Sequence, residues 1–502
     1  MSQSAMALSA MGRARWKVGK RWLWFIHRWL GVAACLLFVL WFLSGLVMMY
    51  VRFPTLDEAE RVAHSPPIAW RQVRLGPQAV LEKTKLKAFP TDLILSMWGD
   101  EPVYRLVEGR RRLGVSAIDG RTIGEVEAAK ARQIVTAAYP GAQPRFLRTL
   151  ERDQWTVAQR FNAARPLHLF ALDDQAGTQL YVGEQGGEIV LDTNRIERFW
   201  NWLGAVPHWL YFTALRSMPQ AWNQVVLWTS GIGMVSAVTG IWIGVLRVRV
   251  KRRYAGGRMS PYRGWMTWHH MVGLVGGVFV LTWVFSGWMS MNPNDWGGPG
   301  DAVMAGRKVW MTPSPTPYPL DAVALRARTG DRVARFYWLG DRPLMLVDTG
   351  PNARTLLDPS NGRAVVLSQA ELFDRAAGLV PGAHLVQRER LTQDDAYWYS
   401  HHDRAPLPVL RAKFDDPARS WFYIDPLSGR MIGVADRSLR LYRWTFSALH
   451  SLDFKFLLSH RPMWDMVIWL LSIFGLMISI SGVVIGWRRL RHDLVSLTRT
   501  RP

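Results

Sequence analysis

Cysteine is nearly absent from this chain: Cys35 is the only one in 502 residues. A single thiol excludes disulfides within the chain, cysteine-based zinc sites, iron–sulfur clusters and covalent haem attachment through Cys-x-x-Cys-His. The sequence also contains no phosphate-binding loop, dinucleotide-binding glycine fingerprint, Ser/His/Asp grouping or flavin signature. Sites of those kinds are therefore excluded, and any electron donor to this chain must be another molecule.

Acidic residues are scarce, since 39 Asp and Glu are set against 62 Lys and Arg, a formal net charge of +23. Such an excess is typical of proteins that bind nucleic acids. Here, however, much of the excess lies in short segments beside long apolar runs, where membrane topology explains it. We therefore expect no nucleic-acid partner.

Four long apolar runs are present, and each is long enough to cross a hydrocarbon core of about 30 Å as a helix of about 20 residues. Residues 32–47 and 467–484 contain no charged side chain. This disfavours the alternative of four buried helices in a soluble protein. The predicted spans are residues 22–50, 221–247, 265–291 and 464–487, and the predicted surroundings are a lipid bilayer.

Basic residues beside the spans predict their orientation, because short cytoplasmic segments are enriched in Lys and Arg. They fill the N-terminal segment 1–21, the loop 248–264 and the C-terminal tail 488–502. All three should lie in the cytoplasm, which leaves two long inserts on the opposite side. Basic residues flank the first span as they do in a signal peptide, but the span is longer than the apolar region of a signal peptide. We therefore expect that the first span is retained in the mature protein.

The sequence repeats with an offset of 242 residues, the separation of His27 from His269. By the same offset Ser44-Gly45 corresponds to Ser286-Gly287. Further corresponding pairs are His208 and His450, Trp222 and Trp464, Gly240 and Gly482, and Gly244 and Gly486. The predicted fold is therefore a membrane α-helical four-span bundle built from two tandem repeats, with two α+β inserts.

The inserts, residues 51–197 and 292–439, mix helical stretches with strand signals. Alternating polar and apolar residues around glycine-containing turns predict one β-hairpin in each insert. These hairpins are residues 178–182 with 186–190 and residues 421–425 with 428–432. Each insert leads into a segment rich in Trp and Tyr, residues 198–220 and 440–463, as expected at a membrane–water interface.

The repeated histidines are the candidate ligands. His27 and His269 open their spans near the cytoplasmic side, whereas His208 and His450 lie in the interfacial segments. An ionisable side chain within a membrane is expensive and therefore indicates function. If a pseudo-two-fold axis along the membrane normal relates the halves, the members of each pair meet at that axis. Two facing imidazoles can hold a haem iron, so we predict two bis-histidine b haems, an inner one on His27 and His269 and an outer one on His208 and His450.

Other interpretations stay open. Histidines near an interface often act as hydrogen-bonded anchors, and a zinc site is a weaker option because no carboxylate or thiol recurs with them. His270 competes with the adjacent His269, but its counterpart is Arg28, so the repeat favours His269. The tract containing His401 and His402 could bind a chelate, although a structural role is expected. Glycines near the histidines suit either a macrocycle or close helix packing: Gly31, Gly45, Gly273, Gly276, Gly277 and Gly287.

Several spaced motifs occur in the order found in a known family: His27-Arg28-Trp29-Leu30-Gly31, Trp268-His269-His270, Leu449-His450-Ser451 and Arg461-Pro462-Met463-Trp464. They resemble the PepSY-associated transmembrane family over nearly the whole chain. The resemblance implies a bacterial inner-membrane protein with periplasmic PepSY-like inserts. Some members are linked to iron uptake and are similar to haem-containing reductases that release iron from ferric siderophores. The first insert departs from the family pattern after residues 165–168, which puts in doubt whether both inserts bind a ligand.

The leading hypothesis is a transmembrane electron conduit. Electrons from a cytoplasmic or quinol donor would pass from the inner to the outer haem and reduce a periplasmic ferric chelate. One electron is enough to release the metal, because hard oxygen chelators hold Fe(II) far more weakly than Fe(III). The alternative is a membrane-anchored regulatory module, because PepSY modules resemble domains that regulate peptidases. A transporter is a third option, disfavoured because no intramembrane carboxylate recurs.

Overall fold

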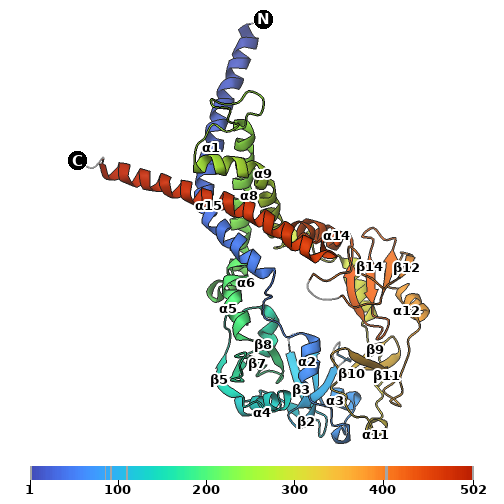
Figure 1. Cartoon of the computed structure of the whole chain (residues 1–502). Helices are drawn as coiled ribbons and strands as arrows, with labels where there is room; N and C mark the ends of the chain where they lie inside the picture. Colours follow the sequence, from blue (N-terminus) through green and yellow to red (C-terminus); the bar gives the residue numbers. More distant parts are fainter. Residues whose placement is uncertain are drawn as a thin grey trace. The chain divides into compact units, whose positions relative to one another are not determined.

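The computed structural model describes residues 3–84, 86, 88–90, 93–108, 111–401 and 405–499, so His402 lies outside the described residues. The chain forms two compact units, each assembled from segments far apart in the sequence (Figure 1). The helical unit comprises Met1–Arg52, Trp200–Gly297 and Leu441–Pro502. The insert unit comprises Phe53–Phe199 and Gly298–Arg440.

Four helices of the helical unit are long and apolar enough to cross a membrane. They are α1 (Gln3–Met48), α8 (Pro219–Arg247), α9 (Trp265–Met289) and α15 (Arg461–Arg499). The helices α1 and α15 continue beyond the predicted spans into the basic flanks, because Lys and Arg are good helix formers. The chain is therefore a multi-pass membrane protein with a helical bundle and α+β inserts.

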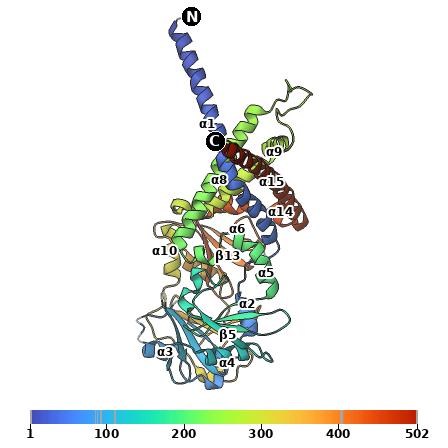
Figure 2. The same ribbon diagram turned by 90° about the vertical axis from the view of Figure 1, so that its left-hand side faces the viewer.

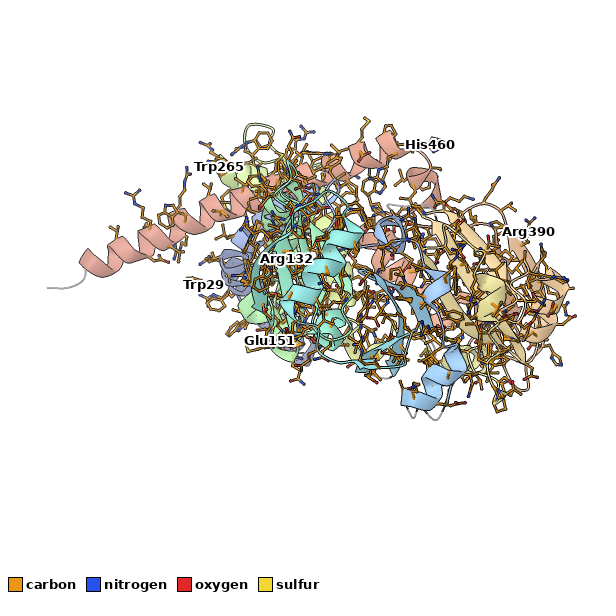
Figure 3. The ribbon with its side chains drawn as sticks, turned by 90° about the horizontal axis from the view of Figure 1, so that it is seen from below. Trp29, Arg132, Glu151, Trp265, Arg390 and His460 are labelled. Atoms are coloured by element: carbon orange, nitrogen blue, oxygen red, sulfur yellow. The ribbon has the colours of Figure 1, made fainter. Side chains whose placement is uncertain are left out.

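The four long helices pack side by side in a closed arrangement, in which α1 contacts α8 and α15, and α9 contacts the same two helices. Figure 2 shows them from the side. The diagonal helices α1 and α9 meet through aromatic side chains, since the ring centroids of Phe42 and Trp283 are 5.6 Å apart. Trp29 and Trp265 instead point outward from the bundle (Figure 3) and are exposed, as expected of side chains that face lipid.

Short helices connect the insert unit to the long helices. On the first side these are α5 (Arg195–Leu203), α6 (Ala205–His208) and α7 (Thr213–Arg216). On the second side they are α13 (Arg437–Tyr442), a π-helical turn η4 (Arg443–Ala448) and α14 (Lys455–Leu458). Because α6 packs on α1 and η4 packs on α9, these connections bring His208 and His450 to the bundle.

The insert unit contains strands from both halves of the chain. The first set is β1 (Leu93–Trp98), β2 (Glu101–Glu108), β3 (Arg111–Ser116), β4 (Thr122–Ile123), β5 (Arg145–Leu150), β6 (Leu167–Ala171), β7 (Gln179–Gly183) and β8 (Ile189–Thr193). The second set is β9 (Val333–Leu339), β10 (Arg342–Gly350), β11 (Ala353–Leu357), β12 (Leu385–Leu391), β13 (Val409–Phe414), β14 (Trp421–Ile424) and β15 (Met431–Ala435). The strands β6 and β13 start 242 residues apart, at Leu167 and Val409.

Helices flank these strands. In the first half they are α2 (Glu58–His64), η1 (Trp70–Gln72), α3 (Pro77–Thr84), α4 (Ala128–Ala138) and η2 (Gln159–Ala164). In the second half they are α10 (Asp301–Trp310), α11 (Ala322–Leu325) and α12 (Gln369–Ala376), preceded in the helical unit by η3 (Pro293–Asp295). The hairpins predicted from the sequence are confirmed as β7–β8 and β14–β15, with each second strand beginning three residues later than predicted.

The two inserts share one seven-stranded sheet of order β11-β10-β9-β1-β2-β3-β4. Its central junction is the antiparallel pair β1–β9, in which Leu93 faces Phe336 and Ile94 faces Arg335. Two further sheets, β5-β6-β7-β8 and β12-β13-β14-β15, belong to one insert each. The inserts are therefore joined through backbone hydrogen bonds rather than separate.

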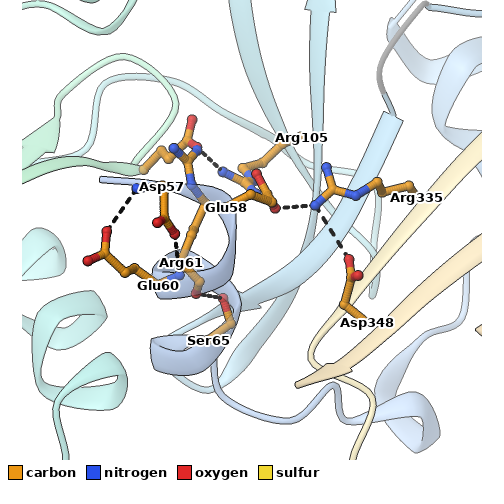
Figure 4. Close-up of polar contacts among 9 residues, drawn as sticks. Asp57, Glu58, Glu60, Arg61, Ser65, Arg105, Arg335 and Asp348 are labelled. Carbon is orange, nitrogen blue, oxygen red and sulfur yellow. Dashed lines mark hydrogen bonds and ion pairs between the residues drawn. The ribbon is translucent and has the colours of Figure 1, made fainter. Parts of the chain in front are cut away.

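An ion-pair group reinforces this junction (Figure 4). The guanidinium of Arg335 on β9 contacts Glu58 of α2 and lies 3.4 Å from the Asp348 carboxylate on β10. Glu58 comes from the first insert, whereas Arg335 and Asp348 come from the second. The side chains of Arg335 and Asp348 are 12% and 7% exposed, so this contact is largely shielded from water.

Candidate functional site

The helical unit brings the four repeated histidines together as two pairs. The ring centroids of His27 on α1 and His269 on α9 are 6.2 Å apart, with an interplanar angle of 41°. Those of His208, the last residue of α6, and His450, which follows η4, are 6.1 Å apart at 70°. All four residues are half-buried. These are the two pairings predicted from the repeat.

The spacing within each pair leaves room for one metal ion between the rings. A metal–imidazole bond of about 2 Å on each side, with about 1 Å from each nitrogen to its ring centre, gives a centroid separation of about 6 Å. Both measured separations, 6.2 Å and 6.1 Å, agree with this sum. Both separations also lie within the range of about 4.5–7 Å for aromatic pairs in direct contact. The spacing of the rings is therefore compatible with two ligands of one metal ion.

The Nδ1 atoms of the first pair are held by carbonyl groups of neighbouring helices. Nδ1 of His27 lies 3.0 Å from the carbonyl oxygen of Ser236 on α8. Nδ1 of His269 lies 3.1 Å from the carbonyl oxygen of Ile478 and 3.0 Å from Oγ of Ser481, both on α15. A ring whose Nδ1–H donates to a carbonyl presents the lone pair of Nε2 on its opposite side, which is the usual arrangement of a metal-ligating histidine.

The second pair follows the same rule with partners on the other two helices. Nδ1 of His208 lies 3.1 Å from the carbonyl oxygen of Trp41 and 3.1 Å from Oγ of Ser44, both on α1. Nδ1 of His450 lies 3.0 Å from Oγ of Ser286 on α9. Among the described residues, the hydrogen bonds of all four rings therefore involve Nδ1, and Nε2 is left for a ligand.

Burial keeps the second pair uncharged. Burial, together with the smaller effect of the neighbouring His450, lowers the pKa of His208 to about 3. Burial likewise lowers the pKa of His450, to about 4. Both imidazoles are consequently neutral at physiological pH, which is the protonation state that binds a metal.

Each histidine ring lies against a glycine. A Cβ added at Gly240 would stand 2.6 Å from Cε1 of His27, and one added at Gly45 would stand 3.3 Å from Cε1 of His208. The corresponding distances for Gly482 with His269 and for Gly287 with His450 are both 3.6 Å. The repeated glycines therefore give the rings room. By contrast, Gly276 and Gly277 contact side chains of α15 and α8, so they serve helix packing.

A cavity of about 300 Å³ opens beside the His27–His269 pair. Its wall is mostly apolar and includes Gly31, Gly273 and Val280. A Cβ at Gly273 would meet nothing within 4 Å, so this glycine borders open space. A small apolar cavity with a few converging polar groups is the usual form of a cofactor site.

His270 is not available as a ligand, although it neighbours His269. Its Nδ1 lies 2.8 Å from Oγ of Ser260 and its Nε2 lies 2.9 Å from the carbonyl oxygen of Gly244, so both ring nitrogens are occupied. His401, which lies in the histidine-containing tract noted in the sequence, belongs to the insert unit.

A bare metal ion would find too few protein ligands at either pair. Among the described residues, no group of three or more His, Cys, Asp or Glu side chains is arranged to hold a metal. Zinc sites need three or four protein ligands, so two imidazoles alone do not make one. A haem supplies four ring nitrogens and needs two axial ligands, and the two ligands, their spacing and the glycine-lined cavity fit that requirement.

The hydrogen-bond partners of His27 and His269 are the residues that sequence reasoning missed. Ser236 and Ile478, whose carbonyl groups hold His27 and His269, are themselves 242 residues apart. So are Thr239 and Ser481, which both offer a hydroxyl to Nδ1. A search for hydroxyl residues that recur at the repeat offset would have found Thr239 and Ser481.

Comparison with known proteins identifies one family. Residues 24–385 match the family described as the PepSY-associated TM region, which is more than half of the chain. The match includes His27, His208 and His269 and ends before His450. No curated protein matches the chain.

Proposed function

Because the chain belongs to the PepSY-associated transmembrane family, we propose that it is a di-haem b-type electron conduit of a bacterial inner membrane that reduces a periplasmic ferric chelate. The observation that carries the proposal is the geometry of the two histidine pairs, with centroids 6.2 Å and 6.1 Å apart and Nδ1 fixed in every ring. Bound haem would supply one-electron transfer, and the protein residues hold and insulate it.

The proposed architecture is two tandem repeats related by a pseudo-two-fold axis along the membrane normal. It is supported by hydrogen bonds that recur at the offset of 242 residues, such as Ser44 with His208 and Ser286 with His450. An axis of this kind relates α1 to α9, and both histidine pairs lie across it. Each half then contributes one ligand to each haem.

The proposed orientation puts the basic loop 248–264 and both termini in the cytoplasm and the insert unit in the periplasm. The helical unit supports this, because only Asp295, Asp453, Asp465 and Asp493 are acidic in it and Arg and Lys gather at the ends of the spans. His27 and His269 would then receive electrons from a cytoplasmic or quinol donor, and His208 and His450 would lie nearer the chelate.

His27 with His269 and His208 with His450 would each hold one haem, and two imidazoles per haem would favour electron transfer over oxygen binding. The apolar wall around the His27–His269 pair, including Val280, keeps water away from that site. The ferric chelate is the substrate: it accepts one electron, and Fe(II) is then released because oxygen ligands hold it weakly. The proposed role is iron acquisition from siderophores.

A visible spectrum of the purified protein tests the proposal. We expect sharp low-spin bands that respond to dithionite, with two spectral components. His208→Ala and His450→Ala should each remove the same component and leave the other intact. The control is His460→Ala: His460 lies in the same interfacial segment and its Nδ1 contacts the carbonyl oxygen of Phe456, but the side chain is exposed (Figure 3).

Two outcomes would contradict the proposal. A protein that stays colourless after addition of haem would exclude the conduit and leave the regulatory PepSY module as the better hypothesis. If His208→Ala and His450→Ala each weakened both components equally, the two residues would not share one haem. Reduction of a ferric siderophore by the dithionite-reduced protein then tests the substrate.

A further inference from the structure

The cavity beside His27 and His269 has a polar group that no interaction within the protein explains. The hydroxyl oxygen of Tyr262 is buried and forms no hydrogen bond with any described residue. Tyr262 lines this cavity, at the end that carries the loop between α8 and α9. A buried hydroxyl without a partner is unfavourable, because it has lost its hydrogen bonds to water, so such groups usually meet a ligand or water.

Two arginines line the same end of the cavity. Arg28 follows His27 on α1, and Arg489 lies seven residues after Gly482 on α15. Both side chains are exposed, and the ion pair of Arg489 is with Asp493 of its own helix, at 3.1 Å. The described residues that line the cavity include no Asp or Glu. This end of an otherwise apolar cavity therefore favours an anionic group.

His270 fixes the position of Tyr262. Its two hydrogen bonds join Ser260 in the loop to Gly244 near the end of α8, and it is only 7% exposed. The ring of Tyr262 stands edge-on to the His270 ring, with centroids 5.4 Å apart, and the backbone N–H of Tyr262 donates to Oγ of Ser260. The loop is thus tied to the bundle through one imidazole.

The Tyr262–His270 pair exists in only one half of the chain, whereas Arg489 corresponds to Arg247 at the repeat offset. At the repeat offset of 242 residues, Arg28 stands where the second half has His270, and Lys20 stands where it has Tyr262. Packing requirements common to both halves therefore do not account for it. A ligand whose polar groups lie on one side only does account for it.

We propose that Tyr262, Arg28 and Arg489 form a carboxylate-binding site that anchors the two propionate groups of the haem held by His27 and His269, and that His270 is the positioning residue that holds Tyr262 in place. This inference rests on the proposed function. Tyr262 O–H and the arginine N–H groups donate, and the carboxylate oxygens accept. Burial raises the pKa of Tyr262, so the phenol remains a donor at physiological pH.

The test is reconstitution of the full-length protein in a His450→Ala background, where only the His27–His269 site binds haem with both ligands. The probes are haem and haem dimethyl ester, which lacks free carboxylates. Haem should dissociate from Tyr262→Phe about 10-fold faster than from the parent, as expected for one lost hydrogen bond to a charged group. The midpoint potential of the bound haem should fall. With the dimethyl ester, the parent and Tyr262→Phe should behave alike.

The control is Tyr254→Phe in the same loop, because the hydroxyl of Tyr254 donates to the Arg247 carbonyl outside the cavity. Tyr254→Phe should leave the dissociation rates of both probes unchanged. His270→Ala should reproduce the effect of Tyr262→Phe, add nothing to it in the double variant and keep the low-spin spectrum. Loss of that spectrum in His270→Ala would mark His270 as a ligand and overturn its positioning role.

Equal rates of haem dissociation from Tyr262→Phe and from the parent would overturn the carboxylate site. A difference in rate between the two proteins that persists with the dimethyl ester would also overturn it. In both cases a low-spin haem would still be bound, so the proposed function would survive. If neither probe bound to the parent, the proposed function would fail together with this inference.

Discussion

The ring of His27 rests on Gly240 of the neighbouring helix α8, where a Cβ would stand 2.6 Å from Cε1 of the imidazole. No real Cβ tolerates that approach, so any larger residue at this position must displace the ring. The contact links a glycine inside an apolar span to the orientation of a candidate ligand, and it makes the role of that glycine testable.

Gly240→Ala should therefore disturb the His27–His269 site and leave the His208–His450 site intact. We expect at least a 10-fold loss of haem affinity at the first site, comparable with losing a group that orients a metal ligand. The measurement is the haem content and the low-spin spectrum of each site. Gly231→Ala on the same helix is the control, because a Cβ there meets nothing within 4 Å. Equal effects of the two variants would contradict the prediction.

Ser44→Ala and Ser286→Ala should weaken the second site, that of His208 and His450. Each serine hydroxyl donates to a carbonyl of its own helix and accepts from Nδ1 of a histidine, Ser44 from His208 and Ser286 from His450. Loss of such an outer partner typically costs 10- to 100-fold in metal affinity. Because the two positions correspond in the repeat, the two losses should be similar. Haem titration checks this, and a loss in only one variant would argue against equivalent roles.

Arg335→Leu should destabilise the shared sheet by about 3 kcal/mol, because it leaves the buried Asp348 without its guanidinium partner. Burial raises the pKa of Asp348 and Arg335 opposes that rise, so the pKa should climb further in the variant. A carboxyl with a raised pKa destabilises the fold at pH values at which the carboxyl is charged. The loss of stability in Arg335→Leu should therefore shrink as the pH falls. Hydrogen exchange of the β9 and β10 amides measures the loss.

Arg342→Leu is the matched control on β10, because Arg342 and its partner Glu371 are 43% and 53% exposed and 3.8 Å apart. Such a pair contributes about 0–1 kcal/mol. A loss in Arg335→Leu that did not change with pH would contradict the explanation from Asp348. Arg335→Leu combined with Asp348→Asn should regain most of the lost stability.

Asp192→Asn should stabilise the insert unit at neutral pH. Burial, together with Glu60 and Glu197, raises the pKa of Asp192 to about 6, above the unfolded value of about 3.9. Its contribution to stability is therefore greatest below about pH 4 and is lost as the pH rises to 6. The gain should be on the order of 1 kcal/mol, because the side chain is only partly buried. Thermal unfolding at pH 4.5 and 7.5 should show the gain mainly at pH 7.5.

Asp173→Asn provides a control of opposite sign. The Arg145 guanidinium holds the pKa of Asp173 below its usual value, so a neutral amide there should lower stability at pH 7.5. A stabilising effect in both variants would point to a general effect of reduced charge instead of the environment of Asp192.

The spans and the histidine pairs could be predicted because two strong constraints act on them. A membrane requires about 20 apolar residues per helix, and the offset of 242 residues in the sequence assigns each histidine its counterpart. The distances between His27 and His269 and between His208 and His450 follow the pairing expected from that reasoning. The haem itself remains a prediction.

The shared sheet could not be predicted in the same way. The apolar residues of β1 and β9 suit buried strands but do not choose a partner, because backbone hydrogen bonds are alike for every antiparallel neighbour. The pairing of Leu93 with Phe336 joins residues 243 positions apart (336 minus 93), with no turn sequence to signal it. The role of His270 was hidden for a related reason: it depends on Ser260, which the repeat does not mark.

The β1–β9 junction limits how the chain can be divided. A fragment that carries one half would expose the edge of β1 or β9 as a row of unpaired N–H and C=O groups, which readily pair with another chain. Each histidine pair would also lose one member, since His27 and His208 belong to the first half. A single half is therefore expected to associate with a second copy or aggregate, and the smallest soluble fragment worth expressing is the insert unit with both of its segments.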